Sequence, residues 1–269
     1  MKAVAKYFPW LALTAILGAL ACVVLWTKQP PEPVYQGKRL SEWLAGYDEP
    51  SPETEEVLRR AGTNAIPTLL RMLRAKDSKV RTRLMVWVRK HHLVKFEYTY
   101  AYQKNAWAAA AFDSLGTQAH EAVPELIEIF EQNISPYSQT YTISALGGTR
   151  SVRAIPTLLR ATTNMNTSTR CNAICALGKI RAEPERVVPV LTRFLKDPNR
   201  SVRAMTISSL VLFGSDAKPA VPDLIQSLND PTMRTLAKYA IPKIDPEAAV
   251  KLGLTNTLEQ VDGGWRLVK

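Results

Sequence analysis

A short phrase built around a proline recurs along this chain, and it is the feature that most constrains the fold. In each copy a small or apolar pair precedes the proline, and an apolar-rich stretch follows it. The prolines of the copies are Pro67, Pro124, Pro156, Pro189 and Pro222. From Pro124 onward they lie 32, 33 and 33 residues apart. A fixed period of this size predicts a stack of helical units, because each unit can bury its apolar face only against its neighbours.

The unit around Pro222 predicts a pair of helices. Asn199 or Ser201 can cap a first helix, whose apolar and small residues recur at helical spacing. Gly214 follows, where a left-handed cap costs little. A second helix is expected over 217–228, with its proline in the first turns, where a missing N–H is tolerated. Similar pairs predict the ends of first helices elsewhere: Leu115-Gly116, Leu146-Gly147, Leu177-Gly178 and Phe213-Gly214.

These residues resemble a known repeat family. The segments Asp197-x5-Arg203, Phe213-Gly214 and Ala220-Val221-Pro222-x-Leu224-Ile225 look like a HEAT repeat, closest to the HEAT-like repeats of bacterial scaffolds and phycobilisome-lyase relatives. The resemblance covers roughly residues 55 to 245 and implies an all-α fold, an α-solenoid (an α-α superhelix of ARM/HEAT type). In the family the Asp and Arg of each unit form a structural ladder. That role would fall here to Asp77, Asp197 and Asp230 with Arg81, Arg203 and Arg234.

An uncharged apolar stretch near the N-terminus predicts a membrane segment. Residues 8–26 would span about 30 Å as a helix, the thickness of a hydrocarbon core. Trp10 and Trp26 lie near its ends, where indole rings favour the interface. Lys2 and Lys6 precede it, so we expect a cytoplasmic N-terminus and a soluble part outside the inner membrane, in the periplasm.

Cleavage of that segment is the alternative. Ala19-Leu20-Ala21 before Cys22 resembles a signal-peptidase site or a poor lipobox, which would give a secreted protein or a lipoprotein. The apolar run continues past Cys22 as far as Trp26, so we favour an uncleaved signal anchor.

The chain then divides into four parts. Residues 1–27 form the signal anchor, and 28–38 form a spacer stiffened by three prolines. Residues 39–253 form the solenoid, with an N-terminal cap that includes Ser41 as a helix cap and an insertion around 78–115. Residues 254–269 form a C-terminal tail that can dock as a strand.

The insertion is the first candidate binding surface. Pro67 and Pro124 lie 57 residues apart, well over one repeat, and the extra residues predict two helices. Insertions in repeat arrays often carry binding determinants. The alternative is that its aromatic side chains fill the wider gap made by the extra helix. The candidates are Tyr98, Tyr100, Tyr102 and Trp107.

The second candidate surface is a row on the second helices, which by analogy would line the concave side. Its members lie four residues beyond each repeat proline, and its arginines suit carboxylate or phosphate groups. The alternative is ordinary solvated helix surface. The row is Arg71, Glu128, Arg160, Arg193 and Gln226.

Signals of enzymatic chemistry are missing from the sequence. It has no nucleotide-binding glycine motif, no HExxH and no GxSxG, and its histidines, His91, His92 and His120, do not have metal-ligand spacing. We therefore expect no catalytic residue, no metal and no cofactor. Cys171 and Cys175 are four residues apart on a predicted helix, and we expect buried thiols; a strained disulfide is the alternative in an oxidising compartment.

Three functions are consistent with these features. The first is a membrane-anchored, non-enzymatic scaffold that binds protein partners not identified by the sequence. The second is a nucleic-acid-binding protein like the HEAT-like DNA glycosylases. The net charge of +11 falls to +8 without Lys2, Lys6 and Lys28 (32 basic minus 24 acidic residues), which permits such binding, but an extracytoplasmic location opposes it. The third, a HEAT-like lyase, rests on the resemblance alone.

Overall fold

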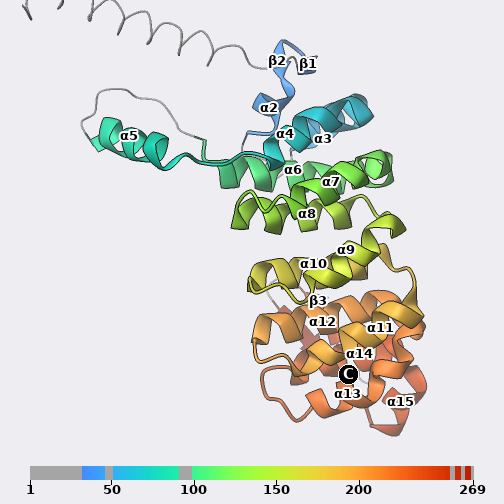
Figure 1. Cartoon of the computed structure of the whole chain (residues 1–269). Coiled ribbons are helices and arrows are strands. Elements are labelled where there is room, and N and C mark those ends of the chain that lie inside the picture. The colour runs from blue at the N-terminus through green and yellow to red at the C-terminus, as the bar shows by residue number, and fades with distance from the viewer. Residues whose placement is uncertain (1–31, 46–50, 91–98, 255–257, 262–263, 268–269) are drawn as a thin grey trace, which may run out of the picture.

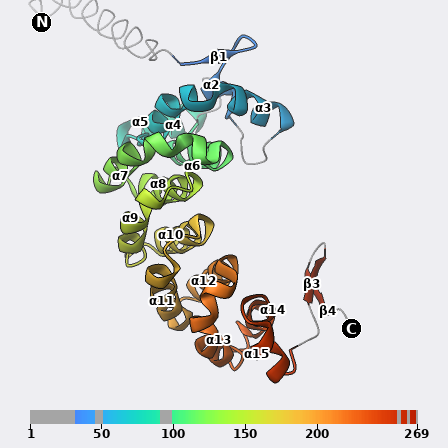
Figure 2. The same cartoon turned by 90° about the vertical axis from the view of Figure 1, so that its right-hand side faces the viewer.

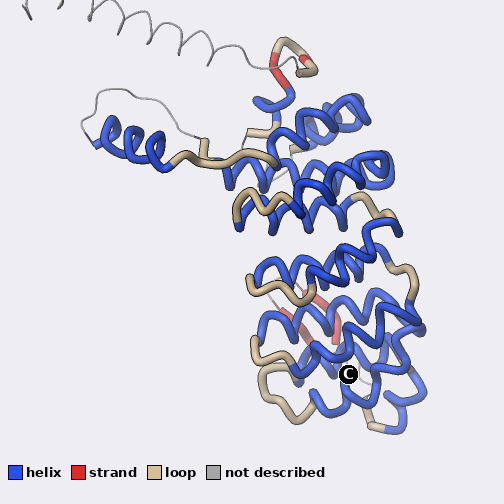
Figure 3. The backbone as a smooth tube through the Cα atoms, in the orientation of Figure 1, coloured by secondary structure: helices blue, strands red, loops and turns tan. Residues whose placement is uncertain are grey.

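The protein is a curved stack of helices, apart from two short hairpins (Figure 1; Figure 3). The structure, a computed structural model, describes residues 32–45, 51–90, 99–254, 258–261 and 264–267. Within these ranges no helix is both long and apolar enough to cross a bilayer. The predicted membrane segment, residues 8–26, lies outside them.

The helices of the stack come in pairs, as the proline period predicts. Each second helix carries a proline in its first turn, where the missing N–H has no intrahelical partner to lose; α11 carries Pro184 there and its repeat proline, Pro189, in its interior. The pairs are α3 (Pro52–Ala61) with α4 (Ile66–Leu73), α6 (Ala101–Leu115) with α7 (Val123–Glu131), α8 (Pro136–Gly148) with α9 (Ile155–Ala161), α10 (Thr167–Ile180) with α11 (Pro184–Arg193), α12 (Arg200–Phe213) with α13 (Val221–Ser227), and α14 (Arg234–Ile244) with α15 (Pro246–Lys251).

Short 3₁₀ turns lead into or follow several second helices. They are η1 (Gly62–Ala65), η2 (Gly116–Ala122), η3 (Val152–Ala154), η4 (Phe194–Lys196) and η5 (Gly214–Ala220). The second helix expected over 217–228 therefore begins as a 3₁₀ turn and becomes α-helical only at Val221. Asn199, not Ser201, caps α12, because its Oδ1 accepts from the backbone amides of Ser201 and Val202.

The pairs form two layers of unequal length, which makes the stack an arc. The first helices α6, α8, α10, α12 and α14 form the inner, concave layer, and α7, α9, α11 and α13 form the outer, convex layer (Figure 2). Successive inner helices pack directly on one another, whereas successive outer helices share few close approaches. A shorter inner layer bends the stack towards itself.

Glycines permit the close approach of the inner helices. A Cβ on Gly147 would lie 2.5 Å from the Ala176 Cβ, and one on Gly178 would lie 2.9 Å from the Ser209 Cβ. A Cβ on Gly148 would meet the backbone of Phe112 and Asp113. The curvature thus depends on residues that lack side chains.

Two of the predicted helix-end glycines have a different role from the one expected. Gly116 and Gly214 do end helices, with φ of +56° and +57°. Gly147 and Gly178 instead lie inside α8 and α10, at their contacts with the next helix. The left-handed positions of those two units fall on Arg150 and Arg181, with φ of 53° and 52°. The prediction is wrong there because a glycine at a helix–helix contact within the last residues of a helix has the same local sequence as a capping glycine.

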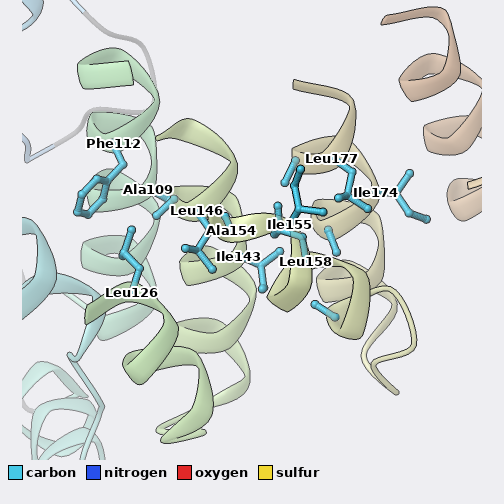
Figure 4. Close-up of a cluster of buried hydrophobic side chains, with 14 of the residues drawn as sticks. Ala109, Phe112, Leu126, Ile143, Leu146, Ala154, Ile155, Leu158, Ile174 and Leu177 are labelled. Carbon is cyan, nitrogen blue, oxygen red and sulfur yellow. The ribbon is translucent and has the colours of Figure 1, made fainter. Parts of the chain in front are cut away.

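One continuous apolar core runs between the layers. Leu and Ile side chains of each pair interdigitate with Ala residues of the next, as around Ile143, Leu146 and Leu158 (Figure 4). No unit has a separate core, so folding of each unit depends on its neighbours.

A small cap covers the N-terminal end of the stack. Strand β1 (Val34–Tyr35) pairs antiparallel with β2 (Lys38–Arg39), and α2 (Leu40–Trp43) follows. Ser41 lies inside α2, and its predicted helix-capping role is wrong: its hydroxyl donates to Glu32 Oε1 at 2.8 Å. Arg71 Nη2 donates to Glu32 Oε2 at 3.3 Å, and the Glu32 side chain is 2% exposed. The first described residue is therefore fastened to the solenoid.

The insertion between the first two pairs contains α5 (Lys79–Lys90), which lies to the side of the stack (Figure 1). Buried Asn105 of α6 closes the junction, since its Nδ2 donates to the carbonyls of Met72 and Leu73 at the end of α4. The Ser138 hydroxyl of α8 also donates to Leu73 O, at 2.7 Å. Polar groups thus bridge the junction where the repeat period is interrupted.

At the other end, the last helix is α15 (Pro246–Lys251), capped by Asp245. The tail contains β3 (Leu258–Val261) and β4 (Gly264–Leu267), which pair as an antiparallel hairpin. The tail therefore contains two strands, one more than the sequence predicted.

Candidate partner-binding surface

The predicted concave row lies on the convex side. Its members belong to the second helices, which form the outer layer (Figure 2). The predicted location is wrong because the first helices carry the small residues, such as Gly147 and Gly178, that allow close packing. Close packing shortens the layer of first helices, so that layer becomes the concave one. Whether the row binds a partner stays a prediction. Its members are Arg71 on α4, Glu128 on α7, Arg160 on α9, Arg193 on α11 and Gln226 on α13.

Much of the charge around this row is used in ion pairs between neighbouring units. Arg160 of α9 pairs with Glu131 of α7. Arg74, which follows α4, lies 3.6 Å from Glu125 and 4.0 Å from Glu128, both on α7. Farther along, the Lys196 ammonium lies 2.7 Å from an Asp223 oxygen. These exposed pairs link outer helices that otherwise touch little.

The Asp and Arg residues that the resemblance assigns to a ladder do serve the scaffold where they are described. Arg203 lies 3.2 Å from Asp230 of the next unit, and its Nη1 donates to the carbonyls of Asp197 and Pro198. Asp77 accepts from the backbone amide of Ala101 at the start of α6. Arg170 repeats the Arg203 pattern by donating to the carbonyls of Asn164 and Met165.

The aromatic candidates divide between core and surface. Tyr98 lies outside the described residues, and Trp107 is 6% exposed, so it is part of the core. Tyr102 is 42% exposed and lies between two other tyrosines. Its ring centroid is 5.9 Å from that of Tyr100 and 5.6 Å from that of Tyr137 on α8.

This tyrosine cluster adjoins a groove between α8 and α10. The groove has a volume of about 590 Å³ and is lined only by uncharged residues. Tyr137, 58% exposed, contributes to both the cluster and the groove. Hydroxyl and amide groups lie beside aromatic rings there, so the surface can contact apolar side chains and hydrogen-bond a polypeptide backbone. The lining residues are Pro136, Tyr137, Thr140, Tyr141, Asn166, Ser168 and Asn172. We call the lining residues, Tyr100 and Tyr102 together the tyrosine groove.

The tyrosine groove faces the inner side of the arc. Each inner helix packs on its neighbours along two sides and on an outer helix behind, so its remaining exposed stripe faces the concavity (Figure 2). The sequence prediction missed Tyr137, Tyr141 and Asn172. Their signal was their position on the partly exposed stripe of a first helix, whereas the family resemblance predicted the concave side on the second helices.

The stretch of chain that contains α8, α9 and α10 is rich in basic residues. No Asp or Glu occurs between residues 132 and 182, whereas six basic residues do: Arg150, Arg153, Arg160, Arg170, Lys179 and Arg181. The four inner helices α8, α10, α12 and α14 together contain seven basic residues and no acidic one. An acidic partner would therefore meet no repelling carboxylate on these helices.

Two thiols lie farther along the same face of α10. Cys171 and Cys175 are free and partly buried. Burial raises the pKa of both thiols, and nearby Arg170 and Lys179 offset this only in part for Cys171 and Cys175 respectively. The neutral thiol form is thus favoured, which makes neither side chain an activated nucleophile.

The described part of the chain contains no group of three or more His, Cys, Asp and Glu side chains placed to bind a metal. Of the three histidines, His91 and His92 lie outside the described residues. His120 is exposed, with Nε2 2.9 Å from Glu121.

Comparison with known proteins agrees with this architecture. The sequence matches the HEAT repeats family over residues 123–198 and 160–242. This region runs from α7 to α14, where the helical pairs are similar to HEAT repeats. No curated protein matches the chain. The resemblance to phycobilisome-lyase relatives and the bacterial origin have no support from these comparisons.

Proposed function

We propose that this protein is a non-enzymatic scaffold, anchored to a membrane through residues 8–26, that binds a partner protein on its inner helical layer. HEAT repeats suggest a scaffold for protein interaction. The observation that carries the choice of surface is the tyrosine groove, which combines exposed rings with hydrogen-bonding groups. Tyrosine is enriched where proteins meet because it supplies area and a polar group at low entropic cost.

Affinity capture with paired variants tests this function. The full chain is used as bait in its membrane, beside Tyr102→Ala/Tyr137→Ala and the outer-layer variant Arg160→Glu/Arg193→Glu. We expect the groove variant to lose a subset of partners that the outer-layer variant keeps, because truncating central aromatic residues costs about 2 kcal/mol or more each in binding. If only the outer-layer variant loses partners, the convex row and not the groove is the binding surface.

A nucleic-acid role is the second candidate, favoured by the stretch 132–182 with its six basic residues. The tyrosine spacing opposes it. A base stacked between two rings needs roughly 7 Å between them, more than the 5.6 and 5.9 Å found here. A DNA titration at several salt concentrations decides: binding that weakens steeply with salt supports this role, and absence of binding at low salt removes it.

A further inference from the structure

We propose that α5 is a second membrane contact, which lies flat on an anionic lipid surface and holds the solenoid against the bilayer. This role is distinct from partner binding in the tyrosine groove and from the anchoring proposed for residues 8–26. It assigns a function to the insertion that interrupts the repeat.

The charge of α5 fits anionic lipid. Its twelve residues include five basic ones and no acidic one: Lys79, Arg81, Arg83, Arg89 and Lys90. Clustered cations beside a surface of acidic headgroups are strongly attracted to it. A basic amphipathic helix is a typical membrane-surface element.

The apolar residues of α5 whose side chains the structure describes, Val80, Val86 and Trp87, are exposed. Val80 is 76% exposed and Trp87 is 52% exposed. They are seven residues apart, which puts them on the same side of the helix, and Leu84 and Val88 occupy the i+4 and i+8 positions of that register. Lys79 and Arg83 fall outside this stripe. Val86, also 51% exposed, lies away from this stripe, and Arg81 and Arg83 flank it. Exposed apolar residues flanked by cations are a combination that binds at a headgroup boundary.

The stack does not cover this helix. Among the described elements none packs extensively on α5, which lies to the side of the inner and outer layers (Figure 1). It branches from the chain between α4 and α6, at the same end of the solenoid as β1 and β2. The chain enters the fold at that end, directly after the segment proposed to cross the membrane. Both contacts would then reach one bilayer surface.

Hydrogen exchange of the full chain with lipid nanodiscs tests the proposal. Discs of phosphatidylcholine alone are compared with discs containing phosphatidylglycerol, in excess over protein. We expect backbone amides of peptides within 79–90 to be protected only with the anionic discs, while peptides of α13 stay unchanged. Reversing two charges in Lys79→Glu/Arg83→Glu should weaken the protection roughly tenfold or more, since each basic residue contributes severalfold to partitioning. Val80→Ser/Trp87→Ser should also weaken it.

The matched control is Arg153→Glu/Lys218→Glu, which makes the same change in net charge at exposed sites away from α5. It should keep the protection. Equal protection in both lipids, or protection without lipid, would overturn the proposal. Retention of the protein on discs through a high-salt wash reports the anchor separately, so the anchor can fail while α5 binds, or the reverse.

Discussion

Arg181 occupies a backbone position that favours glycine. Its φ of 52° and ψ of 40° are left-handed α, whereas Gly214 at the end of α12 has a φ of 57° with a ψ of −132°. A side chain in this region costs about 1 kcal/mol or more, so we expect Arg181→Gly to raise the free energy of unfolding by about 0.5–1 kcal/mol after the entropic cost of glycine. The urea midpoint at constant slope measures it.

Gly214→Ala tests a second position of positive φ. A Cβ at Gly214 would meet nothing within 4 Å, so only backbone strain acts. Since the ψ of Gly214 is −132°, outside the left-handed α region, a loss of about 1–3 kcal/mol is expected. Equal stability of both variants and the wild type would show that these turns relax freely.

Asp230 makes the free energy of unfolding depend on pH in the acidic range. The hydroxyl and the backbone amide of Thr232 donate to its Oδ1, and Arg203 lies 3.2 Å away, so the pKa of this carboxyl is lowered. A lowered folded pKa gives stability that is present above the unfolded value of about 3.9 and is lost as pH falls through the folded value. Asp230→Asn should therefore be less stable than the wild type at pH 7, with the gap narrowing near pH 3. A urea series at the two pH values measures this, and a constant gap would contradict it.

At the scale of the helices, Gly147 controls how closely α8 and α10 approach. A methyl group there would lie 2.5 Å from the Ala176 Cβ, far inside contact distance. We expect the clash in Gly147→Ala to destabilise the protein by about 1–3 kcal/mol. This exceeds the roughly 1 kcal/mol by which alanine favours helix over glycine.

Ala176→Gly added to Gly147→Ala should restore part of that stability, because the facing methyl group is removed. Denaturation of both single variants and the double variant gives the coupling between the two positions. Additive losses would mean that the two helices do not meet here as described.

The sequence predicted the helical pairs but not which layer is inner. The proline period is local information, and a proline in a first turn is compatible with helix at every repeat. The direction of curvature depends on contacts between units, such as Gly178 against Ser209, which no single unit reveals. The prediction of the candidate site was incomplete for the same reason. Tyr100 and Tyr102 were found because the insertion is conspicuous, whereas Tyr137 has no local signal beyond its place on a helix stripe.

At the scale of the whole molecule, the two layers differ in how they are held together. Inner helices pack side chain against backbone, whereas ion pairs such as Arg74–Glu125 and Lys196–Asp223 link the outer ones. Exposed ion pairs contribute about 0–1 kcal/mol each and are screened by salt. We therefore expect the outer layer to open as salt rises from 0.1 to 1 M.

Spin labels placed at Gln132 and Gln226, both exposed at the outer layer, report this as a longer distance in pulsed dipolar spectroscopy. The variant Arg74→Gln/Arg160→Gln/Lys196→Gln should have the longer distance already at low salt. If the distance between the labels in the wild type does not change with salt, packing alone determines the curvature of the stack.

The fastening of Glu32 limits how far the solenoid can move from a bilayer. With residue 32 held by Ser41 and Arg71, only residues 27–31 connect the fold to a segment that would end at Trp26. Five residues reach at most about 18 Å when fully extended, and the prolines among them resist coiling. A protein tethered this way would stay within about that distance of the bilayer surface. It could select only partners whose binding segment comes within that height of the lipid, so its reach would be as selective as its binding surface.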